Sequence, residues 1–102
     1  MTKEEKVDQI WTALANVLDP ELHVSITDLG LVYDVTCSAG GSVSIKMTLT
    51  SMGCPLFPVI ESSMKDQLSS LSFVKKVSIE LTFDPPWSFD RMNETARAHL
   101  GI

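Results

Sequence analysis

The chain has 102 residues, of which 44% are hydrophobic and 21% charged, as expected for one globular domain with a single core, residues 1–102. The net charge of −5 and the scattered lysines and arginines argue against nucleic-acid binding, because no basic stripe can neutralise phosphates. The first ten residues lack the apolar run of a secretory signal, and no apolar stretch approaches the roughly 20 residues that span a bilayer. We therefore expect a cytoplasmic protein without membrane contact, whose two cysteines remain thiols.

An amphipathic helix is predicted at the start of the chain. Thr2 and Glu5 have the spacing of a capping box, which satisfies free N–H groups at a helix start. Apolar residues then follow at helical spacing: Val7, Ile10, Trp11, Leu14 and Leu18. Pro20 ends this helix within a polar loop, 19–30, which either forms the rim of a site or is simply solvated.

Three strands are predicted from the alternation of apolar and polar residues. They cover 31–37, 43–49 and 76–83, and the glycines at 40 and 41 mark a hairpin loop between the first two. The residues expected to point inward are Leu31, Tyr33, Val35, Cys37, Val43, Ile45, Met47, Leu49, Val77, Ile79, Leu81 and Phe83. Because each strand has only one apolar face, the helices can cover only one side of the sheet.

Two further helices complete the predicted fold. One begins near Pro55 or Pro58, and the other is capped by Ser88 and ended by Gly101. Trp87, after two prolines, is either a core residue, which we favour, or an exposed recognition aromatic. The predicted fold is a two-layer α+β sandwich in the order αββαβα. Its three-stranded mixed sheet combines an antiparallel hairpin with one parallel strand, which is reached by a right-handed crossover.

The stretch 47–55 joins the second predicted strand to the second helix and carries Cys54. Residues 51–53 allow a sharp turn, and Pro55 suits the first turn of a helix. Free N–H groups and the helix dipole favour a thiolate there, the form of cysteine that binds metals and acts as a nucleophile. Cys54 is therefore either a reactive group at the carboxyl end of a strand or a small buried residue, and the local sequence leaves both open.

A few polar residues could assist Cys54. Thr48 and Thr50 either line its site or occupy the polar face of a strand. Asp19 and Glu21 form a close carboxylate pair that could ligate a metal or take part in acid–base chemistry. Alternatively, Asp19 ends the first helix and Glu21 faces water.

The two histidines and the second cysteine, Cys37, are weaker candidates for a role in the site. His23 could serve as the base of a Cys–His pair, although a solvated loop histidine is the simpler interpretation. His99 falls in the last helical turn, Cys37 is expected in the core, and Asp28 is expected to close a turn on its own backbone. Structural zinc requires four Cys or His ligands and a cluster about four thiolates, so any cluster must be shared between chains or completed by other ligands.

Four motifs occur in an order that resembles one family. They are Asp19-Pro20-Glu21, Asp28-Leu29-Gly30-Leu31-Val32-Tyr33, Leu49-Thr50-x-x-x-Cys54-Pro55 and Asp84-Pro85-Pro86-Trp87. Together they resemble the small iron–sulfur cluster assembly family that includes SufT and PaaD, over essentially the whole chain. The resemblance implies the αββαβα fold and a role in maturing or delivering iron–sulfur clusters, with Cys54 as the key residue.

The resemblance also implies the surroundings and partners of Cys54. The positions near the family's cysteine are matched by Asp19, Glu21, Thr48 and Thr50. The implied partners are apo iron–sulfur proteins and cluster-assembly proteins, and the implied cofactor is a transient iron–sulfur cluster. From the thiol count we expect such a cluster to bridge the subunits of a homodimer. The chain lacks the cysteine-bearing tail of PaaD-type members, which leaves an oxygenase-specific role without support.

We therefore expect an assembly or delivery factor and not an enzyme, with Cys54 as the metal ligand. Two alternatives remain open at this point. One is a thiol enzyme that uses Cys54 as nucleophile and His23 as base. The other is a metal-free adaptor that docks apoproteins through the segment 84–87.

Overall fold

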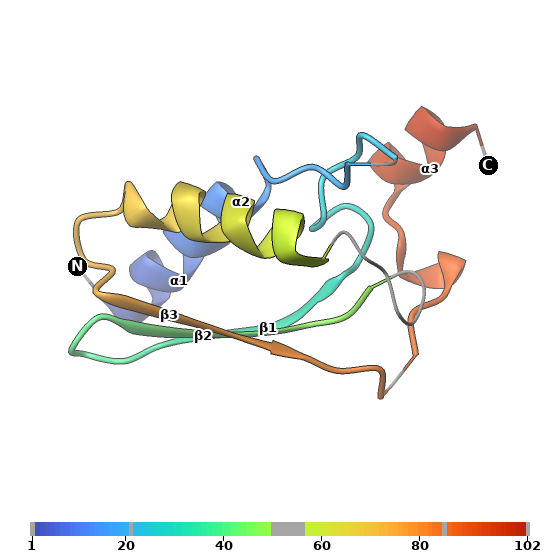
Figure 1. The fold of residues 1–102 in the computed structure, drawn as a ribbon. Helices are drawn as coiled ribbons and strands as arrows, with labels where there is room; N and C mark the ends of the chain where they lie inside the picture. The colour runs from blue at the N-terminus through green and yellow to red at the C-terminus, as the bar shows by residue number, and fades with distance from the viewer. Residues whose placement is uncertain (1, 21, 50–56, 85, 102) are drawn as a thin grey trace.

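The structure is a computed structural model that describes residues 2–20, 22–49, 57–84 and 86–101. Its elements in chain order are α1 (Lys3–Leu14), β1 (Val32–Cys37), β2 (Ser42–Met47), α2 (Phe57–Ser69), β3 (Lys76–Leu81), a 3₁₀ turn (Phe89–Arg91) and α3 (Glu94–Leu100). Helices α1 and α2 lie side by side on one face of the sheet, and α3 stands beyond one end of it (Figure 1). The predicted αββαβα order is confirmed.

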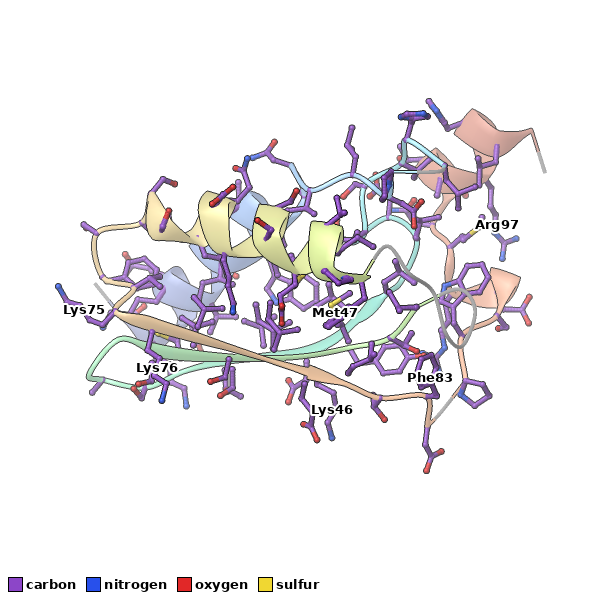
Figure 2. The ribbon with its side chains drawn as sticks, viewed as in Figure 1. Lys46, Met47, Lys75, Lys76, Phe83 and Arg97 are labelled. Carbon is purple, nitrogen blue, oxygen red and sulfur yellow. The ribbon has the colours of Figure 1, made fainter. Side chains whose placement is uncertain are left out.

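The sheet is mixed, as predicted. Its strand order is β1-β2-β3, with β1 antiparallel to β2 and β2 parallel to β3. Alternation along β2 buries Val43, Ile45 and Met47 under the helices and exposes the residues between them. Figure 2 shows Met47 on the helix side and Lys46 on the open side. The two-layer α+β sandwich therefore follows from a period of two along the central strand.

The apolar face of β3 is less buried than the alternation predicts. Val77 and Ile79 are half-buried, and Leu81 is 36% exposed. β3 is at the edge of the sheet, and of the described helices and strands it contacts only β2 and α2. An edge strand has neighbours on one side only, which explains the partial burial.

A β-bulge changes the inward set of β1. Val32 pairs with Met47 and Asp34 pairs with Lys46, so the intervening Tyr33 is the extra residue of the bulge. Val32 is buried, whereas Tyr33 is only half-buried, so the prediction that Tyr33 points into the core is wrong. A bulge inserts one extra residue, so the inward and outward positions exchange at that point. A prediction that assumes strict alternation cannot detect this change.

The first helix is shorter than predicted. Thr2 caps it by accepting a hydrogen bond from the Glu5 N–H, as expected, but the helix ends at Leu14. Leu18 is 52% exposed instead of lying on the apolar stripe, and Val17 is buried in its place. Ile26 N–H donates to the Val17 carbonyl at 2.9 Å, so pairing with the following loop replaces the last helical turn.

The last helix also begins later than predicted. Asn93, and not Ser88, is the N-cap of α3, because its Oδ1 accepts a hydrogen bond from the Ala96 N–H at 2.9 Å. Ser88 instead precedes the 3₁₀ turn, whose Arg91 N–H donates to the Ser88 carbonyl. Gly101 ends α3 in a left-handed conformation, as predicted. Of the helices in the described ranges, none combines the length and apolar character that crossing a membrane requires.

Gly30 gives the first testable prediction. Its φ is 77°, and a Cβ at this position would meet the backbone of Arg91. We expect Gly30→Ala to lower the free energy of unfolding by more than about 1 kcal/mol, because alanine is strained at positive φ and the space is filled. Gly40→Ala is the matched control and should change it by less than about 0.5 kcal/mol. An added Cβ there meets only Ser38 Oγ, at 3.9 Å. Equal losses in urea unfolding would contradict this account.

Candidate functional site

Three segments that carry sequence motifs meet at the end of the sheet where β2 finishes. Thr48 N–H donates to the Leu31 carbonyl at 2.8 Å, and Leu31 N–H donates to the Ile26 carbonyl at 3.0 Å. On the other side of β2, Thr82 N–H donates to the Met47 carbonyl at 2.8 Å. The loop before β1, the residues after β2 and the chain after β3 are therefore tied together here, beside the C-terminal segment (Figure 1).

The C-terminal segment docks on the loop before β1 through directional hydrogen bonds. Asn93 donates twice to Asp28, from Nδ2 to Oδ1 at 2.7 Å and from its backbone N–H to the carbonyl at 3.0 Å. Trp87 Nε1–H donates to the Leu29 carbonyl at 2.6 Å. The expectation that Asp28 closes a turn on its own backbone is therefore wrong, because its oxygens bind Asn93. The core position favoured for Trp87 is confirmed: it is half-buried and packs against the core.

Arg91 adds a second contact between the same two segments. Its backbone passes close to Gly30, and its guanidinium lies over the Tyr33 ring, 4.6 Å from the centroid. This geometry suits a cation–π interaction. Sequence reasoning missed both Arg91 and Asn93. The available signal for Asn93 was a good N-cap residue directly before Glu94.

Asp19 is the buried carboxylate of the site region. Its side chain is 7% exposed, and Oδ1 accepts a hydrogen bond from the Leu22 N–H at 3.0 Å. Its backbone N–H donates to the Val24 carbonyl, and its carbonyl accepts from the His23 N–H. Asp19 thus organises a tight turn in the loop 19–30. The alternative role, ending the first helix, is wrong, because α1 already ends at Leu14.

The two histidines lie on the surface. His23 is exposed, with a φ of 56° in the left-handed region, which costs a residue other than glycine about 1 kcal/mol or more. His99 is exposed in the last turn of α3, as predicted. Cys37 is a 4% exposed core residue, also as predicted, and it lies at the opposite end of β1 from Val32.

Thr48 carries a buried hydroxyl that finds no hydrogen-bond partner among the residues that the structure describes. The residue is 0% exposed, and the atom concerned is Oγ1. Alternation along β2 predicts the open polar face for Thr48, where the more central Lys46 is indeed exposed. A buried hydroxyl without a partner costs about 1–3 kcal/mol, so this group needs a physical explanation.

Three predicted site residues, Cys54, Thr50 and Glu21, lie outside the described residues. The segments that flank them are described: Leu49 is buried after β2, and α2 begins at Phe57. Pro58 falls in the first turn of α2, where its missing N–H removes no helical bond. In the described ranges, which exclude Cys54 and Glu21, no three His, Cys, Asp or Glu side chains gather as a metal site.

Comparison with known proteins decides the family. The family model described as iron–sulfur cluster assembly protein matches residues 7–81. The chain belongs to this family. It is 46% identical over 100 residues to the Fe–S protein maturation auxiliary factor YitW of Bacillus subtilis, covering 98% of both chains. It is 40% identical over 86 residues to the Fe–S protein maturation auxiliary factor SufT of Staphylococcus aureus, covering 84% of this chain and 98% of SufT.

The other matches agree with the fold. A crystal structure of a domain of unknown function, DUF59, from Bacillus anthracis superimposes with a TM-score of 0.94 at 40% identity, covering 98% of this chain and 95% of that one. A putative 1,2-phenylacetyl-CoA epoxidase component of Escherichia coli is 36% identical over 96 residues, which cover 93% of this chain but 57% of that protein. The chain therefore spans about half the length of this PaaD-type relative.

The burial of Cys37 makes thiol reactivity a test of the Cys54 prediction. Cys37 is 4% exposed, and its Sγ lies 3.5 Å from the Ser38 carbonyl. We expect Cys54 to be alkylated at least about tenfold faster than Cys37 in the folded protein, because a helix start favours the thiolate. Competitive labelling with mass spectrometry measures the ratio, and unfolding in urea should abolish it. Equal rates in the folded protein would contradict the prediction.

Proposed function

We propose that this protein is an accessory factor that helps to assemble iron–sulfur clusters or to deliver them to apoproteins. The observation that carries the proposal is the match to YitW, named as a Fe–S protein maturation auxiliary factor, over 98% of both chains. The alignment therefore includes nearly every residue of both chains. The similarity to SufT, named in the same way, supports a role in maturation and not in turnover of a small substrate.

In this role the iron or the cluster is cargo, and Cys54 is its proposed ligand. A cysteine thiolate is the soft ligand that iron–sulfur chemistry requires. The carboxylates of Asp19 and Glu21 and the hydroxyls of Thr48 and Thr50 are proposed to surround that ligand. Two observations fit this donor set: the Asp19 carboxylate is buried, and the Thr48 Oγ1 has no partner among the described residues.

The small number of thiols in the chain explains why the cargo would be held only transiently. A cluster generally takes about four thiolates, and the chain has two cysteines. Cys37 is buried in the core near the opposite end of the sheet from Thr48. With Cys37 in the core, each chain offers at most one thiolate ligand, which favours a cluster shared between two chains, or between this chain and an assembly or client protein, and released on transfer.

The two alternatives gain no support from the described residues. An adaptor that recognises clients through Trp87 would need its indole to be available, but Nε1–H is already bonded to the Leu29 carbonyl at 2.6 Å. A thiol enzyme would need His23 held as a base, but this side chain is exposed on a surface turn. The accessory-factor proposal requires neither Trp87 nor His23 to act in chemistry.

Replacing Cys54 tests the proposal directly. Cys54→Ser keeps the size of the residue but removes the soft ligand, so maturation of a cytosolic iron–sulfur enzyme such as aconitase should fall about tenfold or more. Aconitase specific activity in cells that depend on each variant is the measurement. The matched control is His23→Ala, which should mature aconitase as well as the parent protein, because ligation needs no general base. If Cys54→Ser supports full activity, the ligand role is wrong; if His23→Ala is equally damaging, the thiol-enzyme alternative gains.

Replacing Thr48 separates stability from function at the same site. Thr48→Val keeps the shape and removes a buried hydroxyl that has no partner among the described residues, so we expect the free energy of unfolding to rise by about 1 kcal/mol. If the hydroxyl serves the cargo, this more stable variant should mature aconitase less well than the parent protein. Thr48→Ser retains the hydroxyl and should mature aconitase better than Thr48→Val. A variant that is both more stable and fully active would remove Thr48 from the proposed site.

A further inference from the structure

The outer edge of β3 presents unpaired backbone groups. Lys76 N–H and Thr82 N–H both donate toward the β2 side, to the Gly41 and Met47 carbonyls. Because successive N–H groups of a strand point to opposite sides, those of residues 77, 79 and 81 face away from β2. Figure 1 shows β3 along the free margin of the sheet, and no described strand pairs with that side.

The side chains along β3 divide by face. Lys76, Ser78 and Glu80 are exposed on the open face of the sheet, and Figure 2 shows Lys76 pointing away from the helices. Val77 and Ile79 lie on the helix side and are only half-buried. The edge therefore offers two charges of opposite sign on one face and partly covered apolar side chains on the other.

We propose that two copies of this chain pair through the free edges of β3, antiparallel about a two-fold axis at Ser78. In this register Lys76 lies opposite the partner's Glu80, and Val77 lies opposite the partner's Ile79. Symmetry repeats both pairs, which gives two cross-strand ion pairs and two apolar pairs. The outward N–H and carbonyl groups of residues 77 and 79 then face those of the partner, as an antiparallel hydrogen-bonded pair requires.

The charges of Lys76 and Glu80 favour one of the antiparallel registers in which two β3 strands could pair. A slip of one residue would place helix-side residues against open-face residues, so only even shifts keep the two faces matched. Of the two nearest even shifts, one puts Ile79 on the axis and Glu80 opposite the partner's Ser78. The other puts Val77 on the axis and Lys76 opposite the partner's Ser78, so both shifts lose the Lys–Glu pairs. Charged residues on an edge strand usually prevent pairing, but here the two-fold axis brings opposite charges together. A second copy is therefore a better fit than an unrelated strand.

This pairing goes beyond the proposed function and does not depend on it. The two-fold axis is perpendicular to the sheet, so the product is a continuous six-stranded sheet with both sets of helices on one face. The β2 ends that carry Thr48 then lie at opposite ends of the dimer. The dimer forms without metal, and a cluster shared between chains would require a different contact.

Charge reversal on metal-free protein tests the interface. In sedimentation velocity over a wide concentration range, the parent protein should dimerise, and Glu80→Lys or Lys76→Glu should each weaken dimerisation about tenfold. The double variant Lys76→Glu/Glu80→Lys should restore it to within about threefold, because the pairs are re-formed with reversed sign. Glu80→Lys also places a lysine beside Lys46, its neighbour in β2, and the double variant retains that neighbour, so restoration isolates the interface effect.

Matched controls lie on the exposed surface of α2. Lys65→Glu and Asp66→Lys make the same changes in net charge on exposed positions of a helix, not on the paired strand, and should leave dimerisation unchanged. The proposal is overturned if the parent protein stays monomeric at every concentration, if the double variant is as weak as the single variants, or if the controls weaken dimerisation equally.

A cross-link tests the register separately. In the proposed pairing Ser78 faces its own copy in a non-hydrogen-bonded pair, with Cα atoms about 4.5 Å apart, a distance that a disulfide can bridge. In a Cys54→Ser background, Ser78→Cys should form a disulfide-linked dimer on mild oxidation. Ser44→Cys, on the same face of the central strand, should not. Equal cross-linking of the two variants would contradict the register.

Discussion

The arrangement of the candidate site depends on the close approach of the C-terminal segment to Gly30. With a φ of 77° and no side chain, Gly30 lets the backbone at Arg91 pass where a Cβ would otherwise stand. This close approach of the two backbones allows Trp87, before Arg91 in the chain, to bond the Leu29 carbonyl. It likewise allows Asn93, after Arg91, to bond Asp28. These contacts join residues far apart in sequence, so the loop before β1 is held by tertiary contacts as well as by its own turns.

The sequence predicted the layers and the sheet because these depend on short periodic patterns. Alternation along β2 was regular, so the hairpin, the parallel third strand and the buried face of β2 were all confirmed. The errors at Tyr33, Leu18 and Ser88 share another cause. A bulge, a pairing with the following loop and a contact between Asp28 and Asn93 each changed a local pattern, and none of these three features has a periodic signal in the sequence.

The candidate site was predictable only in part. The motif pattern placed Asp19 and Thr48 near the cysteine, and the structure places the segments that carry them at one end of the sheet. The sequence could not show that Thr48 is completely buried, because the alternation of apolar and polar residues assigns Thr48 to the open face of the sheet, with Lys46. Cys54, Thr50 and Glu21 remain predictions from sequence, since they lie outside the described residues.

Backbone strain and a buried polar group without a described partner both occur near the candidate site, at His23 and Thr48. In the hairpin between β1 and β2 the left-handed position is filled by Gly41, which adopts it without strain. In the loop 19–30 a left-handed position is filled by His23, whose N–H donates to the Asp19 carbonyl. The Thr48 hydroxyl, which has no partner among the described residues, is buried after β2. Strained or unsatisfied groups persist where the surrounding structure holds them in place, and they cluster at binding sites more than elsewhere. Within the described residues, the strain at His23 and the unpartnered hydroxyl of Thr48 are therefore compatible with the ligand role proposed for this end of the sheet.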